Sequence, residues 1–175
     1  MRITISGLPG SGTTTVAKLL ANELALDVIS AGELFRKLAE EKSLLLEQFS
    51  KLAEDNDDFD RWIDEKQGEE ALKRENVIVE GRLSGFFVPH ADLRIWLKAP
   101  VEVRAGRVAG RENIAYEEAL SAMKSREQSE YMRYEKYYGI HLDDLSVYDL
   151  IIDSSRWSEN DIVKIILVAK ERVRE

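Results

Sequence analysis

The chain has no cysteine among its 175 residues and only two histidines. The absence of cysteine excludes disulfides, iron–sulfur clusters and thiolate zinc sites. His90 and His141 lie far apart in the sequence, so a histidine-rich metal site is not expected. Any metal ion that this chain binds should therefore be held by oxygen atoms, such as those of hydroxyl and phosphate groups.

Long apolar runs and an excess of basic residues are also missing. The longest apolar run, residues 165–169, is too short to cross a bilayer. Because a β-rich run starts at residue 2, we do not expect a signal peptide. The net charge of −8 argues against a general affinity for nucleic acid, which requires a basic surface. We therefore expect a monomeric, single-domain cytoplasmic protein that binds neither membranes nor nucleic acid.

Five short β-rich runs alternate with helical stretches. The runs are RITIS (2–6), DVIS (27–30), NVIVEG (76–81), DLRIWLKA (92–99) and YDLIIDSS (148–155). The last helix, 159–174, begins with a capping box formed by Ser158 and Asp161. This alternation predicts a three-layer α/β fold, in which helices cover both faces of a five-stranded parallel sheet.

Two connections are longer than a crossover between parallel strands requires. Residues 31–75, with about three helices, join the second run to the third, and residues 100–147 join the fourth to the fifth. Ligands of open parallel sheets bind beyond the carboxyl ends of the strands. Segments that converge there are residues 7–14, SAGE, EGR, KAP and DSS. We interpret the two long connections as movable flaps on one domain.

The loop GLPGSGTTT (7–15) matches the phosphate-binding pattern G-x-x-x-x-G-K-[ST], except that Thr13 stands in place of the lysine. Its glycines allow backbone N–H groups to turn inward around phosphate oxygens, and the following helix adds its positive end. Thr14 offers a hydroxyl of the kind that ligates Mg²⁺. The predicted nucleotide-binding residues of the loop are Gly7, Leu8, Pro9, Gly10, Ser11, Gly12, Thr13, Thr14 and Thr15. The missing positive charge is expected to come from other residues.

The segment SAGELFR (30–36) brings an arginine to the same edge. Ser30 ends a strand, Gly32 frees the backbone near a ligand, and Arg36 follows one helical turn later. A guanidinium fork suits a pair of phosphate oxygens. A helix N-cap followed by a solvated arginine would show the same pattern.

The segment VIVEGR (77–82) is an apolar strand that delivers Glu80, Gly81 and Arg82 to this edge. A charged pair at the end of a buried strand needs a partner, because unpaired charges there are costly. Glu80 either organises Mg²⁺-bound water or holds Arg82 in place.

Charged residues of the second long connection recur at helical spacing. They are Arg104, Arg107, Arg111, Arg126, Glu130 and Arg133. Two salt-bridged surface helices would produce the same spacing. Because the phosphate loop lacks its own cation, the pattern favours arginines that neutralise phosphate.

Other conspicuous residues are interpreted as structural. The acidic run EDNDDFD (54–60) is expected to be a solvated helix junction, and Trp62, Trp96 and Trp157 fit packing roles. Four tyrosines at helical spacing are expected to pack the second flap: Tyr131, Tyr134, Tyr137 and Tyr138.

With these segments assembled, the chain resembles the nucleoside monophosphate kinases, most closely the archaeal type of cytidylate kinase. The resemblance runs nearly end to end through ISGLPGSGTTTVAKLLA, ISAGELFRKLA, VIVEGRLSGF, ADLRIWLKAP, EVRAGRVAGRE, SREQSEYMRY and YDLIIDSS. It implies a P-loop kinase core with a helical NMP-binding insertion and a lid, and the transfer of the γ-phosphate of ATP to CMP or dCMP with Mg²⁺. The implied boundaries are core 1–30, 76–105 and 141–175, insertion 31–75 and lid 106–140.

The resemblance also implies roles for individual residues. Ser30, Arg36 and Arg82, with Gly32 and Gly81 beside them, match the acceptor site. Glu130 falls where bacterial relatives carry an aspartate facing the acceptor sugar. Arginines matching the ATP side are Arg104 and Arg107, and those matching the lid are Arg126 and Arg133. We assign Arg107, Arg126 and Arg133 to catalysis, Arg104 to ATP and Thr14 to the metal ion.

Two departures from the family pattern leave alternatives open. Thr13 replaces the loop lysine, and Leu83 stands where bacterial cytidylate kinases have aspartate. The alternatives are a kinase specific for AMP or UMP, a small-metabolite kinase, and a nucleotide sensor without catalytic activity. Of these, the small-metabolite kinase would not need the large 31–75 insertion.

Overall fold

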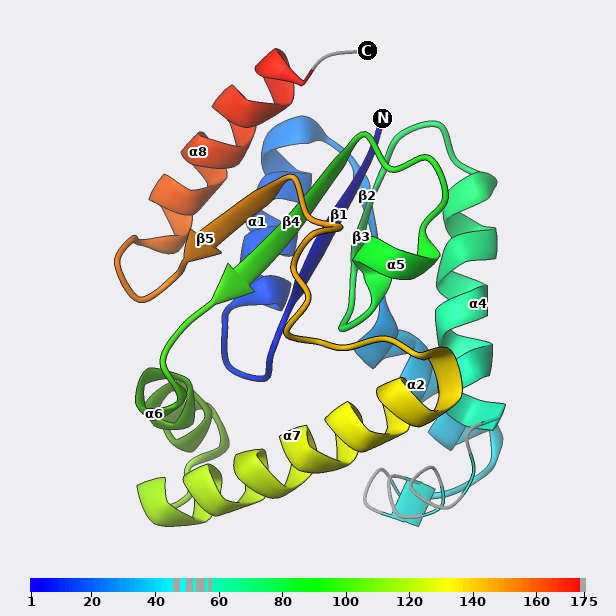
Figure 1. Cartoon of the computed structure of the whole chain (residues 1–175), viewed down its shortest axis with the longest axis vertical. Helices are drawn as coiled ribbons and strands as arrows, with labels where there is room; N and C mark the ends of the chain where they lie inside the picture. The colour runs from blue at the N-terminus through cyan, green and yellow to red at the C-terminus, as the bar shows by residue number, and fades with distance from the viewer. Residues whose placement is uncertain (46–47, 50–51, 53–55, 57, 174–175) are drawn as a thin grey trace.

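A five-stranded parallel sheet forms the centre of the molecule (Figure 1). The computed structural model of the chain describes residues 1–45, 48–49, 52, 56 and 58–173. Its strands are β1 (Arg2–Gly7), β2 (Asp27–Ser30), β3 (Val77–Glu80), β4 (Leu93–Lys98) and β5 (Leu150–Asp153), in the order β2-β3-β1-β4-β5. All four strand pairs are parallel. The predicted sheet and its five strands are confirmed.

Helices cover both faces of the sheet, which explains why the central strands are continuous apolar runs. On one face, α1 (Thr13–Leu24) and α8 (Glu159–Arg172) pack on Ile3 and Ile5, which are fully buried. On the other face, α4 (Asp58–Leu72) packs on Val77 and Val79. The short helix α5 (Ser84–Phe87) lies against β1 and α4.

Three further helices surround the carboxyl ends of the strands (Figure 1). They are α2 (Ala31–Glu41), α6 (Val101–Glu112) and α7 (Tyr116–Tyr138). Helices α6 and α7 pack on each other through a small apolar cluster. Of the helices expected in residues 31–75, α2 and α4 are present, and the segment between them lies partly outside the described residues.

An aromatic cluster attaches α7 to the sheet. Tyr134 of α7 packs with Leu83, Trp96 and Tyr148, and all four side chains are buried. The packing roles expected for Trp96 and Tyr134 are therefore confirmed. At the other end of the chain, the Asp161 N–H donates to the Ser158 hydroxyl at 3.2 Å, which confirms the predicted cap of α8. No helix in the described part of the chain is both long and apolar enough to cross a membrane.

Candidate functional site

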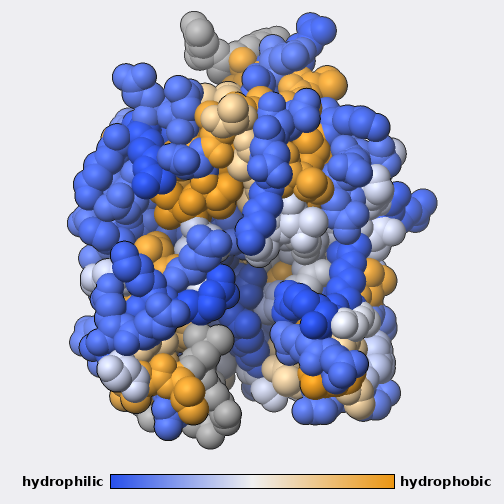
Figure 2. Space-filling model, turned by 180° about the vertical axis from the view of Figure 1, so that it is seen from behind, coloured by the Kyte–Doolittle hydropathy of each residue, from blue (hydrophilic) through white to orange (hydrophobic). Residues whose placement is uncertain are grey.

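Two cavities meet at the loop between β1 and α1. The smaller, of about 280 Å³, lies between residues 10–16 of the loop and first turn of α1, helix α6, the segment that follows β5 and the start of α8. The larger, of about 480 Å³, lies between the loop, the end of β3 and helices α2, α4 and α7. Seen from behind, the lower half of the molecule is hollowed between two lobes, and hydrophilic residues line the hollow (Figure 2). This is the edge at which the sequence predicts a ligand.

The loop has the backbone geometry of an anion site. Gly10 and Gly12 have φ angles of 79° and 95°. Residues other than glycine disfavour this region, because their Cβ atoms clash with the backbone there. Helix α1 begins at Thr13, directly after the second of them, so the first N–H groups of the helix lack helical partners. Unpaired N–H groups at the positive end of a helix attract phosphate oxygens. The loop is therefore suited to the phosphates of a nucleotide.

Glu80, at the end of β3, accepts hydrogen bonds from three hydroxyl groups. Thr13 donates to Oε1 at 2.7 Å and Thr14 to the same oxygen at 3.3 Å, while Ser30 donates to Oε2 at 2.8 Å. Glu80 is thus not the hydrogen-bond partner of Arg82, and that alternative in the sequence interpretation is wrong. The reason is geometric, because Arg82 lies beyond Gly81 and turns toward α7.

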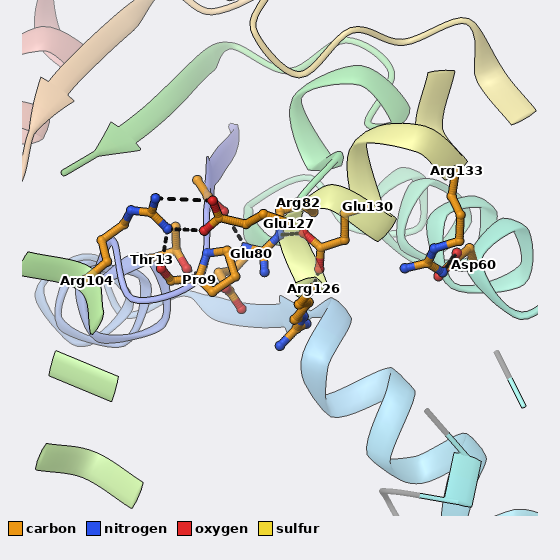
Figure 3. A network of polar contacts seen from close by, with 11 residues as sticks. Pro9, Thr13, Asp60, Glu80, Arg82, Arg104, Arg126, Glu127, Glu130 and Arg133 are labelled. Atoms are coloured by element: carbon orange, nitrogen blue, oxygen red, sulfur yellow. Dashed lines mark hydrogen bonds and ion pairs between the residues drawn. The ribbon is translucent and has the colours of Figure 1, made fainter. Parts of the chain in front are cut away.

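Arg82 instead pairs with Glu130 of α7 (Figure 3). Its Nε donates to Glu130 Oε2 at 2.8 Å, and its Nη1 donates to the Gly7 carbonyl. Arg126 donates to the other oxygen of Glu130 at 2.9 Å. Burial alone would raise the pKa of Glu130, but Arg82 and Arg126 outweigh burial and hold that pKa below its usual range. The carboxylate is therefore ionised between two guanidinium groups.

Arg133 extends from α7 toward α4, where it forms an ion pair with Asp60 (Figure 3). Both side chains line the larger cavity. The Nε of Arg133 is buried and has no hydrogen-bond partner among the described residues. The interpretation of residues 54–60 as a solvated junction is wrong for Asp60, since Arg133 draws it into the cavity; residues 54, 55 and 57 lie outside the described part.

The arginines of α6 differ in position. Arg104 is buried beneath the loop, where it donates to the Pro9 and Ala99 carbonyls at 3.0 Å and pairs with Glu127. Arg107 lines the smaller cavity and donates to the Gly10 carbonyl at 3.2 Å and to the Ser154 carbonyl at 2.7 Å. The structure thus places Arg107 at the smaller cavity and makes Arg104 a support for the loop backbone.

The remaining predicted residues also gather here. Ser30, Gly32, Arg36, Gly81 and Arg82 line the larger cavity. The packing role expected for Trp157 is wrong, because its side chain is 53% exposed and lines the smaller cavity. Trp157 follows the carboxyl end of β5, and the carboxyl ends of the strands form the edge at which a ligand is expected. This position was the signal that could have placed Trp157 at the cavity.

Every cation that lines the two cavities in the described part of the chain is an arginine. They are Arg36, Arg82, Arg107, Arg111, Arg126 and Arg133. Five carboxylates line the cavities as well: Asp60, Asp64, Glu80, Glu130 and Glu159. No cluster of three or more His, Cys, Asp or Glu suited to a metal ion occurs among the described residues. Six guanidinium groups on two neighbouring cavities are suited to binding the oxygen atoms of anions.

Asp64 of α4 is a buried carboxyl that the sequence interpretation missed. It is 8% exposed, lines the larger cavity and accepts a hydrogen bond from the Tyr138 hydroxyl at 3.0 Å. Burial, together with the nearby Asp60, raises its pKa to about 7, although Tyr138 and Arg133 oppose the shift. Its helical spacing from Asp60 was the available signal, but the sequence did not indicate burial.

The raised pKa of Asp64 predicts a dependence of stability on pH. Because the folded-state pKa lies above the usual value of 3.8, the folded chain binds the extra proton, and its stability falls as pH rises from about 4 to 7. Asp64→Asn removes this loss. The free energy of unfolding of the variant, minus that of the unchanged chain, should therefore be about 2–3 kcal/mol more positive at pH 8 than at pH 5.

Urea unfolding of both proteins at the two pH values measures the effect. Glu69→Gln, which removes a carboxyl that is 63% exposed on the same helix, is the matched control for a lost charge. An equal change at pH 5 and pH 8 for Asp64→Asn would contradict the raised pKa.

The chain is similar to known proteins over its whole length. Residues 2–156 match the model of the cytidylate kinase-like family. A cytidylate kinase of Archaeoglobus fulgidus is 50% identical over 171 residues, 98% of this chain and 95% of the relative. A cytidylate kinase of Methanocella arvoryzae is 49% identical over 175 residues, 100% of this chain and 99% of the relative. The structure of shikimate kinase from Aquifex aeolicus superposes with a TM-score of 0.60 at 20% identity, covering 98% of this chain and 96% of that one, a likeness of fold alone.

Proposed function

Because the chain belongs to the cytidylate kinase-like family, we propose that its two cavities hold the two substrates of one phosphoryl transfer. The chain is an ATP-dependent CMP kinase, which transfers the γ-phosphate of ATP to CMP and gives ADP and CDP. ATP occupies the smaller cavity and CMP the larger. The observation that carries this assignment is that the glycine loop borders both cavities.

Phosphoryl transfer requires little covalent chemistry from the protein, so positioning and charge stabilisation supply most of the rate. The acceptor phosphate is already an anion, and no general base is needed. The arginine-lined cavities match this requirement, since guanidinium groups bind phosphate oxygens in pairs.

On the donor side, the N–H groups of the loop and of the first turn of α1 hold the phosphates of ATP. Arg107 adds a guanidinium beside Gly10. The Thr14 hydroxyl fits Mg²⁺, which binds oxygen ligands and usually takes only one or two of them from carboxylates. The Thr14 hydroxyl lies 3.3 Å from one such group, the Glu80 carboxylate. When bound, Mg²⁺ would neutralise charge on the phosphates.

On the acceptor side, Arg36 and Arg82 bind the phosphate of CMP or dCMP, with Ser30 beside them. Arg36 has no ion-pair partner in the described part of the chain, so it is available to an anion. Glu130, held between Arg82 and Arg126, offers carboxylate oxygens for the hydroxyl of the sugar.

The flaps provide closure. Residues 31–75 form the NMP-binding insertion and residues 106–140 the lid, on a core of residues 1–30, 76–105 and 141–175. Arg126 and Arg133 of the lid neutralise the negative charge of the phosphoryl group during its transfer. Closure of the flaps excludes water, which would otherwise compete with CMP as the acceptor.

A panel of acceptors tests the function. With ATP and Mg²⁺, kcat/KM for CMP and dCMP should exceed the values for UMP and AMP by at least about tenfold, because a site that hydrogen-bonds one base leaves polar groups unpaired with another. Formation of ADP is measured with each acceptor and with none. A higher kcat/KM for UMP or AMP would contradict the substrate assignment, and binding of ATP without turnover would favour the sensor.

A further inference from the structure

Thr13 occupies the position where the phosphate-loop pattern has lysine, and its side chain is already engaged. It is 8% exposed, and its hydroxyl donates to Glu80 Oε1 at 2.7 Å (Figure 3). A buried hydrogen bond to a charged group is among the stronger polar contacts in a protein. The Thr13 side chain therefore contacts the end of β3, and its hydroxyl proton is used in the hydrogen bond to Glu80.

The carboxylate of Glu80 joins several segments of the site. One oxygen accepts from Thr13 and Thr14 at the start of α1, and the other accepts from Ser30 at the end of β2. The backbone carbonyl of Glu80 accepts from Gln67 Nε2 of α4 at 2.8 Å. Glu80 is only 8% exposed, so these contacts are shielded from water. The donor loop and the acceptor strands thus share one carboxylate.

A lysine at position 13 would not restore an ordinary phosphate loop here. Its ammonium would lie within reach of the Glu80 carboxylate, which Thr13 already contacts. A charge pair shielded from water attracts strongly, and separating it would leave a buried carboxylate unpaired. The ammonium would therefore be held at β3 and be lost to the phosphates.

From these contacts we propose that Thr13 is a positioning residue, whose hydroxyl fixes Glu80 and through it aligns the donor loop with the acceptor site. The inference rests on the proposed CMP kinase function and deepens it. Thr14 lies on the donor side of the carboxylate and Ser30 on the acceptor side, so both depend on where the carboxylate is held. The position is used for alignment, and the arginines of the flaps supply the charge.

Two variants separate this role from direct contact with ATP. Thr13→Val keeps the shape but removes the hydroxyl, and it should lower kcat/KM for CMP by about 10- to 100-fold, the cost of a charge-assisted hydrogen bond. Thr13→Ser retains the hydroxyl and should recover most of the activity. The Kd for ATP, measured by calorimetry without acceptor, should change less than about threefold in both. A Thr13→Val protein with unchanged kcat/KM, or with a Kd for ATP raised as much as kcat/KM falls, would overturn the proposal.

The lysine variant gives an independent test. Thr13→Lys should lower kcat/KM by about 100-fold, because its ammonium pairs with Glu80 and the hydroxyl that fixes the carboxylate is gone. Full activity of Thr13→Lys would overturn the proposal.

The thermal unfolding temperature provides a readout that does not need activity. Thr13→Val should lower Tm by several degrees when it is the only substitution. It should lower Tm by less in a chain that already carries Glu80→Gln, because the Thr13–Glu80 hydrogen bond is already altered there. An unchanged chain that does not phosphorylate CMP would contradict the function, while equal losses of Tm in the two backgrounds would contradict the Thr13–Glu80 contact.

Discussion

Arg82→Ala should lower kcat/KM for CMP by at least about 100-fold and destabilise the fold by roughly 3 kcal/mol. The loss of activity is expected because the substitution removes a guanidinium fork from the proposed acceptor site. The loss of stability has a separate cause. Glu130 is 3% exposed, and among the described residues it would keep only Arg126, which is itself 64% exposed, as an ion-pair partner. Steady-state kinetics and urea unfolding of the variant measure the two effects.

A second substitution separates the two effects. Adding Glu130→Gln to Arg82→Ala removes the carboxylate that was left partly unpaired, so stability should recover while activity stays low.

The contribution of Glu130 to stability also depends on pH. Because its folded-state pKa is lowered, its contribution is present above the unfolded-state pKa and is lost as pH falls through the folded-state value. Arg82→Ala with normal affinity for CMP would reduce Arg82 to a structural residue.

Arg133→Ala should lower kcat by about 100-fold or more while the Kd for ATP changes little, because a lid cation acts chiefly on the transition state. The buried Nε of this guanidinium has no hydrogen-bond partner in the described part of the chain, so its hydrogen-bonding capacity is not fully used. Single-turnover kinetics at saturating ATP and CMP measure the chemical step directly.

Asp60→Asn is the matched control for Arg133→Ala. It removes the charge that pairs with Arg133 and leaves the guanidinium in place. If Arg133 acts on phosphate, Asp60→Asn should lower kcat by less than about tenfold. Equal losses in the two variants would show that the ion pair, rather than contact with phosphate, is what the reaction requires.

The fold could be predicted from the sequence because its information is local. Apolar runs of four to six residues between helical stretches define parallel strands, and the glycines of the loop define a turn with positive φ. Gly10 and Gly12 do adopt that conformation. Arginines at the strand ends could be assigned to the site, since carboxyl ends of parallel strands meet at one edge.

The partners of those residues could not be predicted in the same way. Thr13 and Glu80 are separated by 67 positions, and Arg133 and Asp60 by 73. Hydrophobic periodicity indicates which face of a helix is buried, but it does not indicate which charge a long side chain will meet. The burial of Asp64 illustrates the limit, because a carboxyl in a charged helix is normally a solvent-facing residue.

The restriction of the cations in the described cavity linings to arginine has a consequence for how the protein behaves toward chemical reagents and alkali. Guanidinium groups do not lose their protons below about pH 12, so the positive charge of the cavities persists under conditions in which a lysine would lose its charge. The described cavity linings contain no lysine. Reagents that acylate or reductively alkylate amines, which can inactivate enzymes through a phosphate-loop lysine, have no target group in these linings, whereas arginine-directed dicarbonyl compounds have six.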